Sequence, residues 1–384
     1  MLLLLLLTLF AIVYAQIGYP CLMGLLARVR PRPVRVELPP PDGVSIILCV
    51  HNGAAGIQQR LQNLLECQWE GTREILVFCD GCDDATAALA ERLGHPDVRV
   101  LSTPSRRGKA AALNDAVRQA RHSFVAFADL RQTFHPAALQ NLALAFRDPA
   151  VGAVSGLLEI APSASGAGRG VDLYWKIERK LREWEAAFDS VIGCTGAIYA
   201  IRRECYQDIP PDTILDDVVI PMQIAQKGLR ILYAPKAIAY DPQQLSPDRE
   251  KARKLRTLVG NYQMLERHPA WMFPWSGRLW WQFVSHKTAR LAVPWLMVAA
   301  ILFNLLAVKT PLVWALLIGQ AGCYTLALTG CALPRLRNRL VSIPAGFLML
   351  QWTCARALLA YARHRGNLLR LWSPPPDAAA RSAC

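Results

Sequence analysis

The hydrophobic positions fall into two arrangements, with long unbroken runs near the ends of the chain and short runs in its middle. Residues 2–26 are almost entirely apolar and carry no charge, a length that crosses a hydrocarbon core of about 30 Å as a helix. A cleaved signal peptide would begin with basic residues and have a shorter apolar run. We therefore predict a transmembrane anchor over 1–27, with further spans at 291–308 and 312–333.

Short apolar runs alternate with helical patterns from about residue 44 to residue 241. The predicted strands are 44–50, 74–80, 98–102 and 123–129, and the predicted helices are 58–68, 85–94 and 109–119. This rhythm is typical of an α/β fold whose mainly parallel sheet carries helices on both faces. Such sheets bind ligands beyond the carboxyl ends of their strands, so the polar residues that follow each strand are candidates for function.

The same pattern divides the chain into parts. The α/β domain is predicted over 44–266, after a basic, Pro-rich linker at 28–43. Tryptophans beside basic residues in 267–290 favour an amphipathic segment at the membrane interface, with a Trp-rich core helix as the alternative. A transmembrane region at 291–362 and a tail at 363–384 complete the division.

Arginines gather beside the apolar runs in a chain of formal charge +14. Those after the first run are Arg28, Arg30, Arg32 and Arg35, and those between later runs are Arg335, Arg337 and Arg339. A nucleic-acid-binding protein would carry its basic residues on a soluble face, so we predict no nucleic-acid partner. The positive-inside rule instead predicts an integral protein of the cell inner or plasma membrane with its α/β domain in the cytoplasm.

The last apolar segment, 340–362, is a weaker candidate span because Arg356 interrupts it. If it crossed the membrane, the basic tail with Arg363, Arg365 and Arg370 would lie outside, against the same rule. We therefore expect that this segment does not cross completely.

Polar turns follow each of the four predicted strands. They contain His51-Asn52-Gly53, Asp80-Gly81, Arg106-Arg107-Gly108-Lys109 and Asp129. A nucleotide diphosphate needs cationic or N–H donors, an acceptor for its base and usually a divalent metal on oxygen ligands. Gly and Asp are ordinary turn residues, so the ordered set is informative where any single turn is not.

Several motifs, in order, resemble the inverting family 2 glycosyltransferases, the group that contains the cellulose, chitin and hyaluronan synthases. On the donor side they are VSIILCVHNG, EILVFCDGCDDAT, RRGKAAALNDA and FADLRQTFHP; downstream they are GCTGAIYAIRRE, ILDDVVIPMQIAQKGLRILYAP and RKLRTLVGNYQML. The resemblance covers residues 44–265 and, with the flanking apolar segments, points to the membrane-bound subgroup. It implies a GT-A-type, Rossmann-like domain flanked by transmembrane helices.

The resemblance also implies roles for individual residues. Asp80 matches the aspartate that contacts the nucleotide base, and Asp129 the first aspartate of the DxD motif, which binds metal and diphosphate. Asp217 matches the general base, and Arg256 the arginine that steadies the leaving diphosphate. The further candidates are His51, Asn52, Gly81 and Lys109 on the donor side and Thr195, Gly196 and Asp216 on the acceptor side.

Elementary chemistry agrees with these roles but leaves alternatives open. Inversion at an anomeric carbon needs a carboxylate that takes the proton of the attacking hydroxyl, whereas Asp216 and Asp217 as an isolated pair would be read as a helix cap. Arg256 is one of several basic residues that would also suit lipid head groups. Lys109 is equally well explained as a solvated lysine at a helix start.

Two positions depart from the family pattern. The second DxD aspartate is Arg131, so Mg²⁺ or Mn²⁺ would be held through Asp129 and phosphate oxygens. Thr257 replaces the tryptophan that stacks on the acceptor sugar in processive synthases, which weakens the case for processive polymerisation.

These observations predict a membrane-bound inverting glycosyltransferase that moves a sugar from a nucleotide sugar, most simply a UDP-sugar, to a lipid-linked or growing polysaccharide acceptor at the cytoplasmic face. Nucleotidyl transfer on a similar fold would not need Asp216 and Asp217 followed by Arg256. A catalytically degenerate, sugar-nucleotide-binding subunit of an envelope polysaccharide complex is the alternative outside enzymes, motivated by Arg131 and Thr257.

Overall fold

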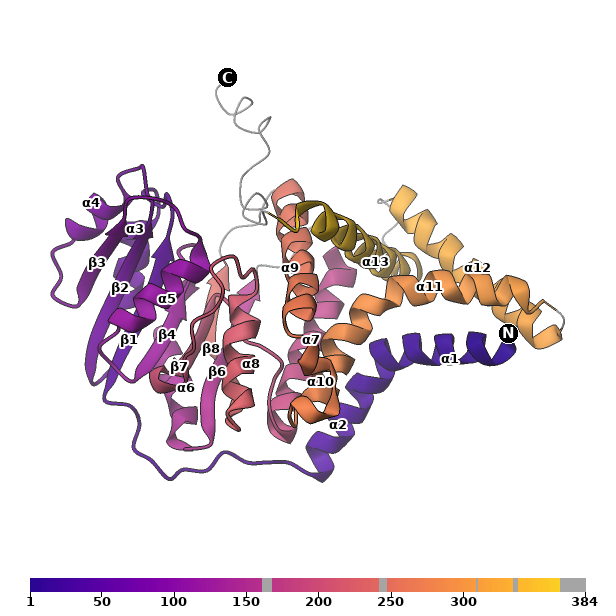
Figure 1. Ribbon diagram of the computed structural model, residues 1–384, viewed down its shortest axis with the longest axis horizontal. Coiled ribbons are helices and arrows are strands. Elements are labelled where there is room, and N and C mark those ends of the chain that lie inside the picture. The colour runs from indigo at the N-terminus through magenta and orange to yellow at the C-terminus, as the bar shows by residue number, and fades with distance from the viewer. Residues whose placement is uncertain (161–167, 242–246, 309, 334–337, 367–384) are drawn as a thin grey trace, which may run out of the picture.

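Figure 1 shows a sheet domain beside a group of long helices in the computed structural model. The structure describes residues 1–160, 168–241, 247–308, 310–333 and 338–366. The first apolar run forms one continuous helix from α1 (Leu2–Val13), the π-helical turn η1 (Tyr14–Gly18) and α2 (Tyr19–Val29). Pro20 lies in the first turn of α2. Proline has no N–H to donate, and the wider π turn ends two residues before it.

The sheet has eight strands in the order β3-β2-β1-β4-β7-β6-β8-β5. Their bounds are β1 Gly43–Val50, β2 Thr72–Asp80, β3 Val98–Thr103, β4 Phe124–Ala128, β5 Thr133–Phe134, β6 Val151–Ile160, β7 Ile198–Arg202 and β8 Arg230–Asp241. The four predicted strands pair in parallel, which confirms that part of the expectation. The sheet as a whole is mixed, since β7 runs antiparallel to both β4 and β6, and β5 antiparallel to β8.

Helices cover both faces of this sheet. One face packs against α3 (Ile57–Leu65), α4 (Thr86–Glu91) and α6 (Ala138–Ala143), and the other against α5 (Lys109–Gln119) and α8 (Asp216–Gln226). Along β1, Ile46 and Leu48 join the first core and Ile47 the second, because successive side chains of a strand point to opposite faces. Burial on both faces explains the continuous apolar runs of β1 and β4.

Two predicted helices end three residues early, at Leu65 and Glu91. Gly94 follows the second with a φ of +61°, the left-handed conformation that commonly closes a helix. Near the first, the N–H of Gln68 donates to the carbonyl of Pro136 at 2.8 Å instead of continuing a helix.

Four helices of the described chain are long and apolar enough to cross a membrane: Leu2–Val29, Trp280–Leu306, Pro311–Ala332 and Leu340–His364. The second combines α10 (Trp280–Phe283), the π turn η6 (Val284–Thr288) and α11 (Ala289–Leu306), while α12 (Pro311–Ala332) and α13 (Arg339–His364) form the others. The length of α13 therefore gives no support to the expectation that it crosses incompletely, which rests on charge alone.

The segment predicted at the interface is divided between core and surface. It follows α9 (Pro247–Arg267) and contains two short 3-10 turns, Pro269–Met272 and Pro274–Ser276, before the helix that starts at Trp280. Trp271 is 6% exposed and stacks on His268, as the core alternative expects, whereas Trp275 is 78% exposed. The long helix thus begins eleven residues before the predicted boundary at 291, since Ser285 and His286 of η6 find partners inside the protein.

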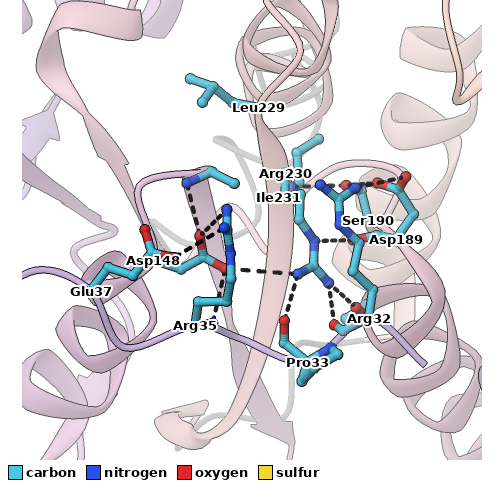
Figure 2. A network of polar contacts seen from close by, with 12 residues as sticks. Arg32, Pro33, Arg35, Glu37, Asp148, Asp189, Ser190, Leu229, Arg230 and Ile231 are labelled. Atoms are coloured by element: carbon cyan, nitrogen blue, oxygen red, sulfur yellow. Dashed lines mark hydrogen bonds and ion pairs between the residues drawn. The ribbon is translucent and has the colours of Figure 1, made fainter.

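The linker between α2 and β1 is held against the sheet domain by a buried arginine, as Figure 2 shows. Arg230, at the start of β8, is 1% exposed and donates to the carbonyls of Arg32 at 2.9 Å and Pro33 at 3.3 Å. The same guanidinium donates to the carbonyls of Asp189 and Ala186, at 2.9 Å and 3.0 Å. The linker is therefore a fixed strap along the domain, which it follows below the sheet in Figure 1.

Candidate active site

Asp80 ends β2 and orders the loop that follows β3. Its buried carboxylate accepts hydrogen bonds from the backbone N–H groups of Arg107 at 2.9 Å and Gly108 at 2.7 Å. Gly81 has a φ of +58°, and a Cβ there would meet the backbone nitrogen of Arg106 at 2.2 Å. The loop can lie this close to the end of β2 only because residue 81 is glycine.

The turn after β1 lies beside this loop. The ring nitrogen Nδ1 of His51 is 2.9 Å from the carbonyl oxygen of Asp80, to which it can donate. Asn52 adopts a φ of +52° and forms two hydrogen bonds with Asp83. Its side-chain Nδ2 donates to the carboxylate of Asp83 at 2.5 Å, and its Oδ1 accepts from the backbone N–H of Asp83 at 3.1 Å. The two turns border a cavity of about 120 Å³, whose lining residues are Cys49, Val50, His51, Asp80, Arg106, Gly108, Lys109 and Ala112.

Lys109 connects Asp129, predicted on the donor side, with Asp216, predicted on the acceptor side. Its ammonium lies 3.2 Å from the carboxylate of Asp129, after β4, and 3.3 Å from that of Asp216, at the start of α8. Burial alone would lower the pKa of Lys109, but the carboxylates of Asp129, Asp216 and Asp217 outweigh it and raise that pKa. Lys109 is therefore a permanent cation inside an acidic cluster and not a solvated lysine.

The carboxylate of Asp217, beside Asp216 at the start of α8, has a raised pKa. Burial and the adjacent carboxylate of Asp216 raise the pKa of Asp217 to about 6, within the range in which a carboxylate exchanges protons efficiently. One of its oxygens accepts a hydrogen bond from the N–H of Gly196 at 3.1 Å. Thr195, the neighbouring candidate, is bound through its hydroxyl to Ser155 and Arg182.

Arg256 lies on α9, within charge range of the same acidic cluster. Burial lowers the pKa of this guanidinium, while the carboxylates of Asp129 and Asp216 act in the opposite direction. Burial is the main reason that the pKa of the Cys49 thiol, near the end of β1, is raised. The charges that also act on this thiol are those of Lys109, Asp216, Asp80 and Asp129. The structure thus gathers Asp80, Asp129 and Asp217 around one site, and the charge of Arg256 acts on its acidic residues.

Arg131, which stands at the second DxD position, turns away from a metal-binding role. Its guanidinium forms a 2.6 Å ion pair with Asp241 at the end of β8, and Gln132 also donates to that carboxylate at 3.3 Å. Asp241 is 5% exposed and was missed in the sequence, where it lies 110 residues from its partner. The signal in the sequence was Arg131 itself, because an arginine at an acidic position of the DxD motif indicates that an acidic partner lies elsewhere in the chain.

The protein side chains at this site could hold a divalent cation only if most of its ligands came from the nucleotide. Within the described residues no three His, Cys, Asp or Glu side chains form a cluster that could hold a metal. Asp129 is 38% exposed and only one of its oxygens is engaged by Lys109. Because Mg²⁺ is commonly bound by one or two carboxylates and substrate phosphates, Asp129 fits this limited role.

A second polar network joins Thr195, a predicted acceptor-side residue, to the long helices. Arg182, on α7 (Gly168–Phe188), donates to Thr195 at 2.9 Å and lies 3.7 Å from Glu178. His286 of η6 places its ring nitrogens 2.9 Å from Glu178 and 2.7 Å from Glu185. None of the α7 residues was predicted, although acidic and basic residues spaced along one face of an amphipathic helix were visible in the sequence.

Curated relatives are similar to part of this chain. Poly-beta-1,6-N-acetyl-D-glucosamine synthases from Staphylococcus aureus strain COL and Staphylococcus epidermidis are 25% and 24% identical to this chain over 205 and 213 residues. These alignments cover 52% and 54% of this chain and 50% and 52% of the relatives, so the chain spans about half the length of the curated relatives it matches.

A solved structure has the same fold over nearly the whole chain. It is the mannosyltransferase PcManGT from Pyrobaculum calidifontis in complex with GDP-Man and Mn²⁺, with a TM-score of 0.69, 23% identity, and coverage of 93% of this chain and 99% of that one. The family model described as glycosyltransferase like family 2 matches residues 40–260, more than half of the chain. The protein therefore belongs to glycosyltransferase family 2.

Proposed function

We propose that this enzyme is a membrane-bound inverting transferase that moves a sugar from a UDP-sugar to a lipid-linked or growing polysaccharide acceptor at the cytoplasmic face. The observation that carries the proposal is the meeting of Lys109, Asp129 and Asp216 beside Asp217. It places a permanent cation next to a carboxylate whose pKa is near neutral. The names of the Staphylococcus relatives support a polysaccharide product.

In this proposal the nucleotide occupies the cavity bordered by His51 and Asp80. The carboxylate of Asp80 holds the 106–108 loop in place, and its predicted contact with the base remains part of the proposal. The acceptor hydroxyl attacks the anomeric carbon from the side opposite the diphosphate, and its proton passes to Asp217. Lys109 and Arg256 stabilise the negative charge that develops on the leaving diphosphate.

A divalent cation would be held by Asp129 together with phosphate oxygens of the donor. When bound, Mg²⁺ or Mn²⁺ supplies further positive charge to the leaving diphosphate. Arg131 is engaged with Asp241, so this chain offers one carboxylate where the family pattern has two. We therefore propose a metal that enters with the nucleotide and binds weakly to the protein alone.

The test is the release of nucleoside diphosphate by purified protein supplied with UDP-N-acetylglucosamine, UDP-glucose or GDP-mannose. We expect release from a UDP-sugar in the wild type and a loss of about 10²-fold or more in Asp217→Asn. Asp208→Asn is the matched control, because Asp208 is an exposed carboxylate that pairs with Arg118. Equal release from the wild type and Asp217→Asn would reject Asp217 as the base.

The degenerate-subunit alternative is favoured by one observation, the ion pair that removes Arg131 from the metal position. It makes a different prediction in the same experiment. Nucleotide binding without turnover of any of the three donors, in the presence of Mn²⁺ and membrane extract as the acceptor source, would support that alternative over transfer.

A further inference from the structure

A cavity of about 130 Å³ lies between α9 and α13 and shares no lining residue with the cavity bordered by His51 and Asp80. Leu255 of α9 forms one wall, and α13 supplies the rest of the lining, which is Arg356, Leu359, Ala360, Arg363 and His364. Residues at these helical spacings lie on one face of a helix. The proposed transfer reaction gives this face of α13 no role.

The cavity combines basic side chains with apolar ones. Arg356 and Arg363 are exposed and His364 is half-buried, while Leu359, on the same face, is 54% exposed. Of the side chains that the structure describes, none from an Asp or Glu lines this cavity. The α9 wall brings no acid from its adjacent stretch either, because residues 251–256 read KARKLR. An anion with an apolar part would match both components of the surface.

The two arginines in the cavity differ from the next basic residue of α13. Arg365 forms an ion pair with Glu266 of α9, and the hydroxyl of Tyr361 donates to the same carboxylate. Among the ion pairs within the described part of the chain, none involves Arg356 or Arg363. The positive charge that faces the cavity is therefore left for a ligand to neutralise.

The cavity lies where a candidate membrane helix meets the sheet domain. α13 forms the candidate span Leu340–His364, and it is tied to α9 through Glu266 and through a 3.3 Å hydrogen bond from the hydroxyl of Tyr262 to the carbonyl of Cys354. Arg356 lies about 12 Å along this helix from its last residues. A charged residue within such a helix is costly and usually faces a partner, a cavity or a ligand, and basic cavities between membrane helices bind acidic lipid head groups.

We propose that the cavity between α9 and α13 binds the phosphate of an anionic phospholipid, with Arg356 and Arg363 as its donors. The guanidinium group presents a planar fork of N–H groups that suits phosphate oxygens. The acyl chains would follow the exposed apolar face of α13, on which Trp352 and Leu359, seven residues apart, are 65% and 54% exposed.

The proposed lipid site is separate from the transfer chemistry, because no bond is made or broken in it. It still borders the proposed active site along the chain, since Leu255 immediately precedes Arg256 on α9. A lipid in this cavity would therefore contact the helix that carries a residue proposed to stabilise the leaving diphosphate.

The test is binding of short-chain lipids to the full-length protein in a detergent with neutral head groups, measured by native mass spectrometry without any donor sugar. The probes are dioctanoyl phosphatidylglycerol, dioctanoylglycerol and inorganic phosphate. We expect the phosphatidylglycerol to bind at least about tenfold more tightly than either other probe, and the double variant Arg356→Gln/Arg363→Gln to lose about tenfold of that affinity.

Two controls separate the cavity from the general attraction between basic residues and acidic lipids. Arg28→Gln removes the same charge from an exposed position in the last turn of α2, outside the cavity, and should leave the affinity within about twofold. Arg356→Lys/Arg363→Lys keeps both charges and should retain most of the affinity. Thermal unfolding of the Gln double variant without lipid should match the wild type, since both side chains are exposed.

A second measurement keeps both arginines in place. In Leu359→Cys the phosphatidylglycerol should slow alkylation of the new thiol by a maleimide at least about threefold, read on the peptide that contains residue 359, because the bound lipid would cover this exposed position.

Four outcomes would overturn the proposal. They are wild-type affinity in the Gln double variant, an equal loss in Arg28→Gln, equally tight dioctanoylglycerol, and an alkylation rate of Leu359→Cys that the lipid does not change. Equally tight inorganic phosphate would show a site for free anions and overturn the lipid assignment.

Discussion

Replacing Gly81 with alanine should disable nucleotide binding through the backbone alone. A Cβ at this position would lie 2.2 Å from the backbone nitrogen of Arg106 and 2.5 Å from the carbonyl carbon of Ser105. Both are main-chain atoms, so no side chain can swing away to relieve the contact. The loop that Asp80 holds must move instead.

The size of that movement follows from the contact. Real Cβ contacts essentially never fall below 3.0 Å, so the loop must retreat by at least 0.8 Å from its 2.2 Å position. The hydrogen bonds from Arg107 and Gly108 to Asp80, now 2.9 Å and 2.7 Å, would then approach or pass the limit of hydrogen bonding. Bonds to a carboxylate contribute roughly 1.5–3 kcal/mol each, which corresponds to a loss of about 10- to 100-fold in nucleotide affinity if one is lost.

Gly94→Ala is the matched control, because Gly94 also has a positive φ, +61°, but its added Cβ would meet only the carbonyl oxygen of Arg92, at 4.0 Å. It should cost roughly 1–2 kcal/mol of stability for the left-handed conformation and leave nucleotide affinity within about twofold, because no steric contact disturbs the loop. Isothermal titration of UDP and GDP, with thermal unfolding of both variants, measures the two effects. Equal nucleotide affinity in Gly81→Ala and Gly94→Ala would refute the reasoning.

Three further predictions concern the base, the altered motif and the strap. Acceptor-dependent kcat/KM should rise with pH around an apparent pKa of about 6 as Asp217 ionises, and Asp216→Asn should lower that midpoint because it removes a neighbouring negative charge; an unchanged midpoint contradicts this. Arg131→Asp should raise the affinity for Mn²⁺ measured by electron paramagnetic resonance, since it adds a carboxylate, and unchanged affinity would show that position 131 lies outside the metal site. Arg230→Met should destabilise the linker contacts by roughly 3–5 kcal/mol, seen as faster amide hydrogen exchange of residues 32–38, because it leaves buried carbonyls unpaired. Arg32→Ala, whose side chain is 48% exposed, should change that exchange by no more than roughly 1 kcal/mol, and equal effects would exclude Arg230 as the holding residue.

The parallel half of the sheet and its site could be predicted because they follow local rules. Buried strands are continuous apolar runs, and the turns after parallel neighbours meet at one edge. These two rules, with the resemblance, led to Asp80, Asp129 and Asp217. The sequence alone does not decide the role of Lys109, because only the fold shows that the carboxylates after β4 and at the start of α8 lie beside it.

The remaining features depend on pairings between distant segments. Arg131 finds Asp241 across 110 residues, and His286 finds Glu178 across 108, distances at which periodicity carries no information. The same cause explains the start of the second long helix at Trp280. The polar turn Val284–Thr288 looks in the sequence like the end of a membrane helix, because its partners on α7 become visible only in the fold.

The strap held by Arg230 has a consequence for which acceptors the enzyme can reach. A free linker of the length of residues 30–42 would let its two ends wander by about 20 Å. Fixed along the domain, it holds the cavity bordered by His51 and Asp80 at one distance from the first long helix. Sugar chains would then be sorted by how far they project from the bilayer, so that a glycan too short or too long for that distance would be a poor substrate even with the correct terminal residue.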